Sequence, residues 1–167
     1  MSLTKEKIVS NTKKYFQTAG EHNFMTEDFT KFLGEDFMQA PASQQTTLNN
    51  AFEGGLIDHL LRTTKFAISF NSVLPDNLKL TKEEIIKVCF LYQIGKAHLF
   101  VPNTSEWHKT NQGEMYEFND KLISMRVGER SALYALSNGV KLTEEEYQAI
   151  VNFDKEDSDK QAKFHTS

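Results

Sequence analysis

The sequence contains a single cysteine, no long apolar run and no excess of basic residues. Because Cys89 has no second cysteine to pair with, an internal disulfide is excluded, and its apolar neighbours predict that it packs as a small hydrophobic side chain. No apolar stretch approaches the roughly 20 residues that span a membrane. The opening segment, MSLTKEKIVSNTKK, lacks the apolar centre of a secretion signal. We therefore predict a cytoplasmic protein that does not contact membranes.

The charge of the chain is slightly acidic and spread along its length. The 167 residues carry a formal net charge of -4 at pH 7, and their lysines and arginines are scattered. Nonspecific binding of nucleic acid requires clustered cations that contact phosphates, so we predict no nucleic-acid partner. The length suits one domain of ordinary size, and we predict a single domain spanning residues 1–167.

Helical periodicity extends over most of the chain and predicts a mainly α fold. Within residues 1–38, Thr4 and Thr26 stand where the N-caps of two helices are expected, and Gly20 stands where the first helix should end. The second helix has an apolar face that we predict to lie in the core, formed by Phe29, Phe32, Leu33 and Phe37.

The next part of the chain begins with a polar loop over residues 39–50. A third helix is predicted just after the glycine pair Gly54 and Gly55, which permits a tight entry. Thr81 and Glu84 then form the sequence pattern of a capping box. The helix that follows this box is apolar nearly all round, so we predict that it is central and buried.

Two more helices complete the core region, which spans residues 39–153. One is predicted over roughly residues 129–137, and the other begins after Thr143 with a second capping box. Residues 154–167 form a polar tail without a periodic apolar face, so we expect this tail to be loosely held.

An irregular segment over residues 101–121 interrupts the helical pattern. Its proline, asparagine and glycine residues, flanked by aromatic ones, predict a surface excursion or a small β-hairpin. We predict an exposed aromatic surface formed by Trp107, Tyr116 and Phe118, which would contact a partner. The alternative is that these three rings only pin the excursion to the core.

Four segments of the sequence, taken in order, carry a family resemblance. They are NNAFEGGLIDHLL with His59, FLYQIGK ending at Lys96, VGERSALYAL starting at Val127, and LTEEEYQAIVNF ending at Phe153. Together they resemble the HD superfamily of metal-dependent phosphohydrolases, where a GGL-x-EH helix supplies a metal-binding histidine and a buried helix ends in HDIGK. One variant of that family also has PAS before the glycines, as Pro41-Ala42-Ser43 does here.

The resemblance covers residues 39–153 and implies a fold. It implies an HD-domain-like helical bundle, with the segment over residues 101–121 as its short irregular or β-hairpin excursion. Members of the family have one more helix, which carries an aspartate, beyond the last helix predicted here. We expect that final core helix either to be missing from this sequence or never to have been part of the protein.

Most residues that bind metal in that family are replaced in this chain. Tyr92 and Gln93 stand at the histidine and aspartate of HDIGK, and Val127 and Phe153 stand where the variant has histidines. His59 is the sole surviving ligand-type residue, and one imidazole does not make a metal site. We therefore predict no metal, no cofactor and a vestigial pocket composed of His59, Tyr92, Gln93, Lys96 and Arg130.

Two functional interpretations follow from the resemblance. In the first, the chain is a catalytically inactive HD-like domain that serves as a binding or structural scaffold, with a protein partner or self-association and room for a small phosphate ligand. In the second, it is a divergent HD-type phosphohydrolase that acts on a nucleotide or another phosphate ester. The second interpretation requires a divalent metal or cations at His59, Lys96 and Arg130 to offset phosphate charge.

Overall fold

The computed structural model describes residues 2–154, which form seven α-helices and one two-stranded antiparallel hairpin. The predicted mainly α fold class is thereby confirmed. Apart from Asp154, the tail predicted to be loosely held over residues 154–167 lies outside the described residues. Within the described part of the chain, no helix is long and apolar enough to cross a membrane.

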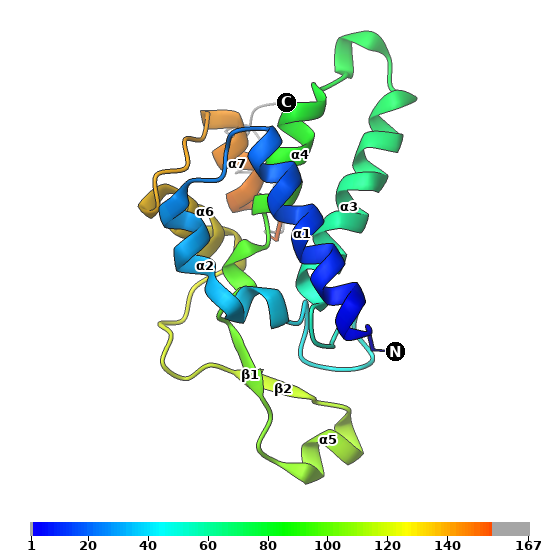
Figure 1. The fold of residues 1–167 in the computed structure, drawn as a ribbon, viewed down its shortest axis with the longest axis vertical. Helices are drawn as coiled ribbons and strands as arrows, with labels where there is room; N and C mark the ends of the chain where they lie inside the picture. Colours follow the sequence, from blue (N-terminus) through cyan, green and yellow to red (C-terminus); the bar gives the residue numbers. More distant parts are fainter. Residues whose placement is uncertain (1, 155–167) are drawn as a thin grey trace, which may run out of the picture.

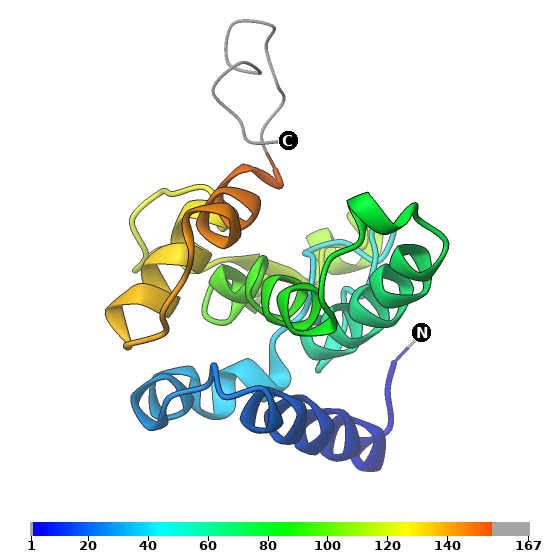
Figure 2. The same ribbon diagram turned by 90° about the horizontal axis from the view of Figure 1, so that it is seen from above.

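The first two helices, α1 (Lys5–Glu21) and α2 (Glu27–Gln39), form one layer beneath the remaining helices (Figure 2). Both begin at the predicted N-caps: the Thr4 hydroxyl accepts a hydrogen bond from the backbone of Lys7, and Thr26 accepts one from Phe29. Three of the four predicted core residues of α2 are fully buried. The prediction is wrong for Phe32, which is 37% exposed because it lies at the edge of this layer, against His98 and Tyr134.

Helix α3 (Gly55–Ser72) begins at the predicted glycine pair. Gly54 has a positive φ of 74°, and a Cβ on Gly55 would lie 2.1 Å from the carbonyl oxygen of Asn50, so the 39–50 loop closes directly on the helix start. The outer half of α3 leaves the core, since Phe66 and Phe70 are 73% and 56% exposed. A short 3₁₀ turn, η1 (Asp76–Leu78), leads to the next helix.

Helix α4 (Lys82–Leu91) is central, as predicted, and its capping box joins Thr81 and Glu84. Its buried residues include Phe90, whose ring stacks on Tyr15 of α1 with centroids 4.4 Å apart. The Tyr15 hydroxyl donates to the Phe90 carbonyl at 3.0 Å, and complete burial raises the pKa of this tyrosine. These contacts fix α4 against the first layer, and a 3₁₀ turn, η2 (Ile94–Lys96), continues the chain beyond α4.

The predicted excursion is a hairpin with a helix at its tip (Figure 1). Strand β1 (Phe100–Pro102) pairs with β2 (Tyr116–Phe118) so that Phe100 lies opposite Phe118. Between them lies α5 (Glu106–Gln112), a helix that the periodicity did not predict. The 39–50 loop holds this end of the hairpin through a bridge between Gln45 and Glu114.

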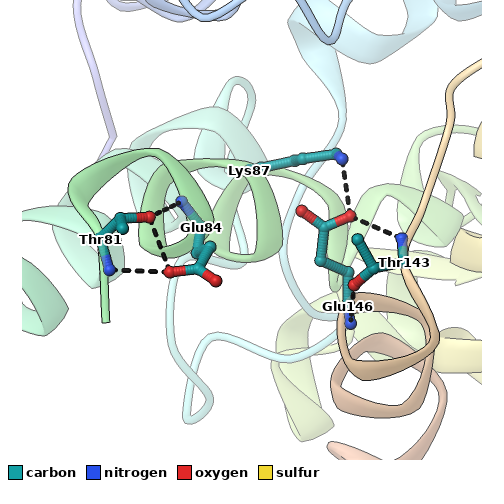
Figure 3. A network of polar contacts seen from close by, with 5 residues as sticks. All are labelled: Thr81, Glu84, Lys87, Thr143 and Glu146. Atoms are coloured by element: carbon teal, nitrogen blue, oxygen red, sulfur yellow. Dashed lines mark hydrogen bonds and ion pairs between the residues drawn. The ribbon is translucent and has the colours of Figure 1, made fainter. Parts of the chain in front are cut away.

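The last two helices, α6 (Val127–Ser137) and α7 (Glu144–Asn152), pack on one another and on α4. Gly128 permits this contact because a Cβ there would lie 2.5 Å from the carbonyl oxygen of Ile150. An ion pair joins Lys87 of α4 to Glu146 of α7 at 2.6 Å, and Glu146 also completes the capping box of α7 (Figure 3). Polar contacts therefore link α4 to α7, two helices that are distant in the sequence.

Candidate functional site

Four residues of the vestigial pocket lie close together where α4 passes into η2. His59 is on the first turns of α3, whose position is set by the glycine pair, and its Nε2 lies 2.7 Å from the hydroxyl of Tyr92. Tyr92 follows the last residue of α4 and also contacts the Thr63 hydroxyl at 3.4 Å. Residues 33 positions apart are thus joined by a direct hydrogen bond.

Lys96 is the cation of this site and is held by two acceptors. Its Nζ donates to the carbonyl oxygen of Ala42 at 2.7 Å and to Oε1 of Gln93 at 2.9 Å. Burial lowers the pKa of Lys96 from 10.5 to about 8, and the negative charge of Asp154 opposes this change. At pH 7 the side chain is therefore still mainly an ammonium group, and it ties the 39–50 loop to η2.

The imidazole of His59 is neutral at pH 7. Burial lowers its pKa most, and the positive charge of Lys96 lowers it further, while the carboxylate of Asp58 has the opposite effect. The neutral imidazole shares a hydrogen bond with a phenol whose own pKa is raised by burial, so both Tyr92 and His59 are uncharged. The only charge among these contacting groups is the Lys96 ammonium.

Arg130, the fifth residue of the vestigial pocket, reaches the same junction through its Cβ. That atom would lie 2.9 Å from a Cβ built on Gly95, so α6 approaches η2 closely. The guanidinium group instead donates to the carbonyl oxygen of Ile123, and its Nε has no hydrogen-bond partner. Arg130 therefore supports the loop before α6 rather than adding its charge beside His59.

The positions at which the family has further histidines are also near this site. The ring of Phe153 packs edge-on against Tyr92, with centroids 4.9 Å apart. The carbonyl oxygen of Val127 accepts a hydrogen bond from Ser131, whose hydroxyl in turn accepts one from the backbone of Gly95. Phe153 and Val127 therefore contribute an apolar ring and a backbone carbonyl group at the junction of α4 and η2.

These residues do not fit a divalent cation. Such an ion requires several anionic oxygens or neutral imidazoles, whereas the contacts here consist of one imidazole, one phenol, one amide and an ammonium group. In residues 2–154, no three His, Cys, Asp or Glu side chains form a group that could hold a metal. His98, the next histidine along the chain, packs against Phe32 and Tyr134 instead.

A buried polar cluster beside His59 was missed by the sequence analysis. Asp58 is only 6% exposed, and its carboxylate accepts hydrogen bonds from Asn11 at 3.2 Å and Asn50 at 3.0 Å. It also forms an ion pair with Arg62 at 2.7 Å. The cluster joins α1, the 39–50 loop and α3, which orients the first turn of the helix carrying His59. The only sequence signal for it is an acidic residue on an otherwise apolar helix turn.

The predicted aromatic surface lies on the hairpin and α5. Trp107 is 59% exposed and Phe118 is 60% exposed, whereas Tyr116 is half-buried. The Trp107 ring contacts His108, and the Phe118 ring contacts Phe100. Two of the three rings are therefore available to a partner.

Comparisons with protein-family models, with curated proteins and with solved structures gave no match to this chain.

Proposed function

We propose that this chain is a catalytically inactive HD-like domain that serves as a binding or structural scaffold. The observation that carries the proposal is the hydrogen bond of 2.7 Å between His59 and Tyr92. This hydrogen bond joins His59, the one histidine that matches a metal ligand of the family, to Tyr92, which stands where the family has another ligand. The scaffold persists around this contact because the caps, the glycine pair and the apolar helices are retained.

The closeness of three positions that bind metal in the family supports the resemblance itself. Residues 59, 92 and 153 carry ligands in the family, and here His59 contacts Tyr92, which contacts Phe153. Three positions singled out by the motifs therefore lie in one continuous set of contacts. The contacts are those of a packed interior, however, because a phenol and a phenyl ring replace charged groups. The proposal explains both features as loss of metal chemistry on a retained framework.

Hydrolysis of a phosphate ester needs an activated water and positive charge near the transferred group. His59 is hydrogen-bonded to Tyr92, and Lys96 is bonded to Gln93 and Ala42. The Arg130 guanidinium is directed at Ile123. The His59 imidazole and the Lys96 ammonium group thus both have protein partners, which favours structural cohesion over turnover. In a scaffold role, the domain would bind its partners through exposed surfaces, among them the aromatic surface.

Activity and metal content test the proposal directly. The purified protein is incubated with Mn²⁺ or Ni²⁺ and a panel of nucleotides, and bound metal and released phosphate are measured. We expect neither stoichiometric metal nor turnover. Phosphate release that depends on metal and is lost in His59→Ala would establish the divergent phosphohydrolase instead.

A gain of function tests the resemblance. The double substitution Tyr92→His and Gln93→Asp places two family ligand types beside His59, giving three donors of the kind that hold a divalent ion. We expect this variant to bind Mn²⁺ measurably by calorimetry, and to lose that binding when His59 is also replaced by Ala. If the double variant binds no more metal than the wild type, the three positions do not form an ancestral metal site.

A further inference from the structure

A hollow of about 870 Å³ lies between α1 and α3. The two helices diverge toward the turn between α3 and α4, and α4 lies between them (Figure 1). Apolar side chains from α3 and α4 form part of its lining, among them Leu61, Ile68 and Ile86. We call this hollow the basic groove because five exposed cations line it, namely Lys7, Lys14, Arg62, Lys65 and Lys82.

The positive charge of the basic groove is largely uncompensated. Its lining includes five cations and two carboxylates, Asp58 and Glu21, in a chain whose net charge is -4. The Asp58 carboxylate is buried and paired with Arg62, and Glu21 accepts a hydrogen bond from Gln17. Among the described residues, no ion pair involves the four lysines of the groove. Four ammonium groups from three helices therefore border one apolar-lined hollow.

We propose that the basic groove binds an amphipathic, acidic helix of a partner protein. This inference rests on the proposed scaffold function and names its partner class. Apolar residues of the partner, spaced three and four apart, would contact Leu61 and Ile68, and flanking Asp or Glu residues would pair with the lysines. α1 has 17 residues, so a partner helix of about 16 residues, roughly 24 Å long, matches the length of the groove wall.

The lining favours an acidic peptide over a nucleic acid. Single strands bind through cations combined with exposed aromatic faces on which bases stack. The lining holds two aromatic rings: that of Phe90 is only 1% exposed, and the half-buried imidazole of His22 is one small ring at the end of α1. Aliphatic side chains instead provide an apolar contact surface, which suits the apolar face of a helix.

A peptide selection tests this inference. A displayed library of random peptides of about 16 residues is selected against the full chain, and enriched peptides are synthesised and measured by fluorescence anisotropy. The groove variant carries Lys7→Glu, Lys14→Glu and Lys65→Glu. The matched control carries Lys5→Glu, Lys13→Glu and Lys121→Glu, which make the same charge change at exposed lysines outside the groove lining. Circular dichroism establishes that both variants fold.

We expect enriched peptides to combine acidic residues with apolar ones at helical spacing. The groove variant should weaken their binding at least about tenfold, the control should leave it within about twofold, and added salt should weaken it. Peptides without this pattern, equal binding to the groove variant, no enrichment, or tighter groove-dependent binding of an oligo(dT) strand would each overturn the inference. These outcomes leave catalytic inactivity untouched, whereas metal-dependent turnover would overturn the proposed function whatever the groove binds.

Discussion

Removing the charge of Lys96 should change how the stability of this protein depends on pH. Burial lowers the pKa of this lysine from 10.5 to about 8 in the folded state. At 1.36 kcal/mol per pH unit, keeping the ammonium group inside the fold costs about 3 kcal/mol. Between these two pKa values the unfolded chain binds a proton that the folded chain has released. The free energy of unfolding therefore rises with pH across this window, and the increment is absent well below pH 8.

Between about pH 7.5 and about pH 9.5, Lys96 should add about 2 kcal/mol to the free energy of unfolding. Lys96→Met removes the titrating amine while retaining most of the side-chain volume, so the increment should disappear. Urea unfolding of both proteins, followed by circular dichroism across this range, gives the difference in slope. Cys89 and the tyrosines with raised pKa also titrate at high pH, but they do so in both proteins and cancel in the comparison.

Lys31→Met provides the control, since this lysine is 69% exposed in an i,i+4 ion pair on the surface. It should leave the pH dependence of the wild type unchanged. If Lys96→Met retains the wild-type slope between about pH 7.5 and 9.5, Lys96 is not held in a desolvated site, and the account of its burial against Gln93 and Ala42 fails with it.

Three further tests, each with its own substitutions, address other parts of the structure. Gly55→Ala should destabilise the fold by more than about 2 kcal/mol in thermal unfolding, because the new Cβ would meet the backbone oxygen of Asn50. The control Gly20→Ala places a Cβ where no other atom lies within 4 Å, so it should be neutral or stabilise the fold by up to about 1 kcal/mol. Lys87→Met and Glu146→Gln, made singly and together, should show a coupling of about 1–3 kcal/mol in urea unfolding, and simple additivity would refute the ion pair. Trp107→Ala should lower stability by less than about 1 kcal/mol but weaken any association through the aromatic surface in analytical ultracentrifugation, and global unfolding would instead show that the ring supports the core.

Helix starts could be predicted because the hydrogen bonds that cap a helix join residues close together in the sequence. A threonine cap and its glutamate partner lie three residues apart, so the capping boxes at Thr81 and Thr143 could be read directly and are both present. The hairpin was predicted as an excursion, but α5 within it was not. That helix has seven residues and too few apolar positions to show a period, although Ser105 caps it and Gly113 ends it with a φ of 66°. Tertiary contacts with the 39–50 loop hold its end in place.

The composition of the vestigial pocket came from the sequence, but its contacts did not. Motif spacing singled out these positions, whereas the hydrogen bond between His59 and Tyr92 and the donation from Lys96 to Ala42 depend on how three distant segments pack. Arg130 shows the same limit, because its guanidinium is directed at the loop before α6 and not at His59. Side-chain direction at an element junction is decided by neighbours that are remote along the chain.

The sequence by itself determined the mainly α class and the threonine caps, because these follow from residue type and short-range spacing. Only the tertiary structure decided what the scattered lysines do. Lys7, Lys65 and Lys82 belong to three different helices, and no sequence window groups them, yet the packing of α1, α3 and α4 places them around one groove. Charge acts through space, so its pattern emerges only when the helices are arranged.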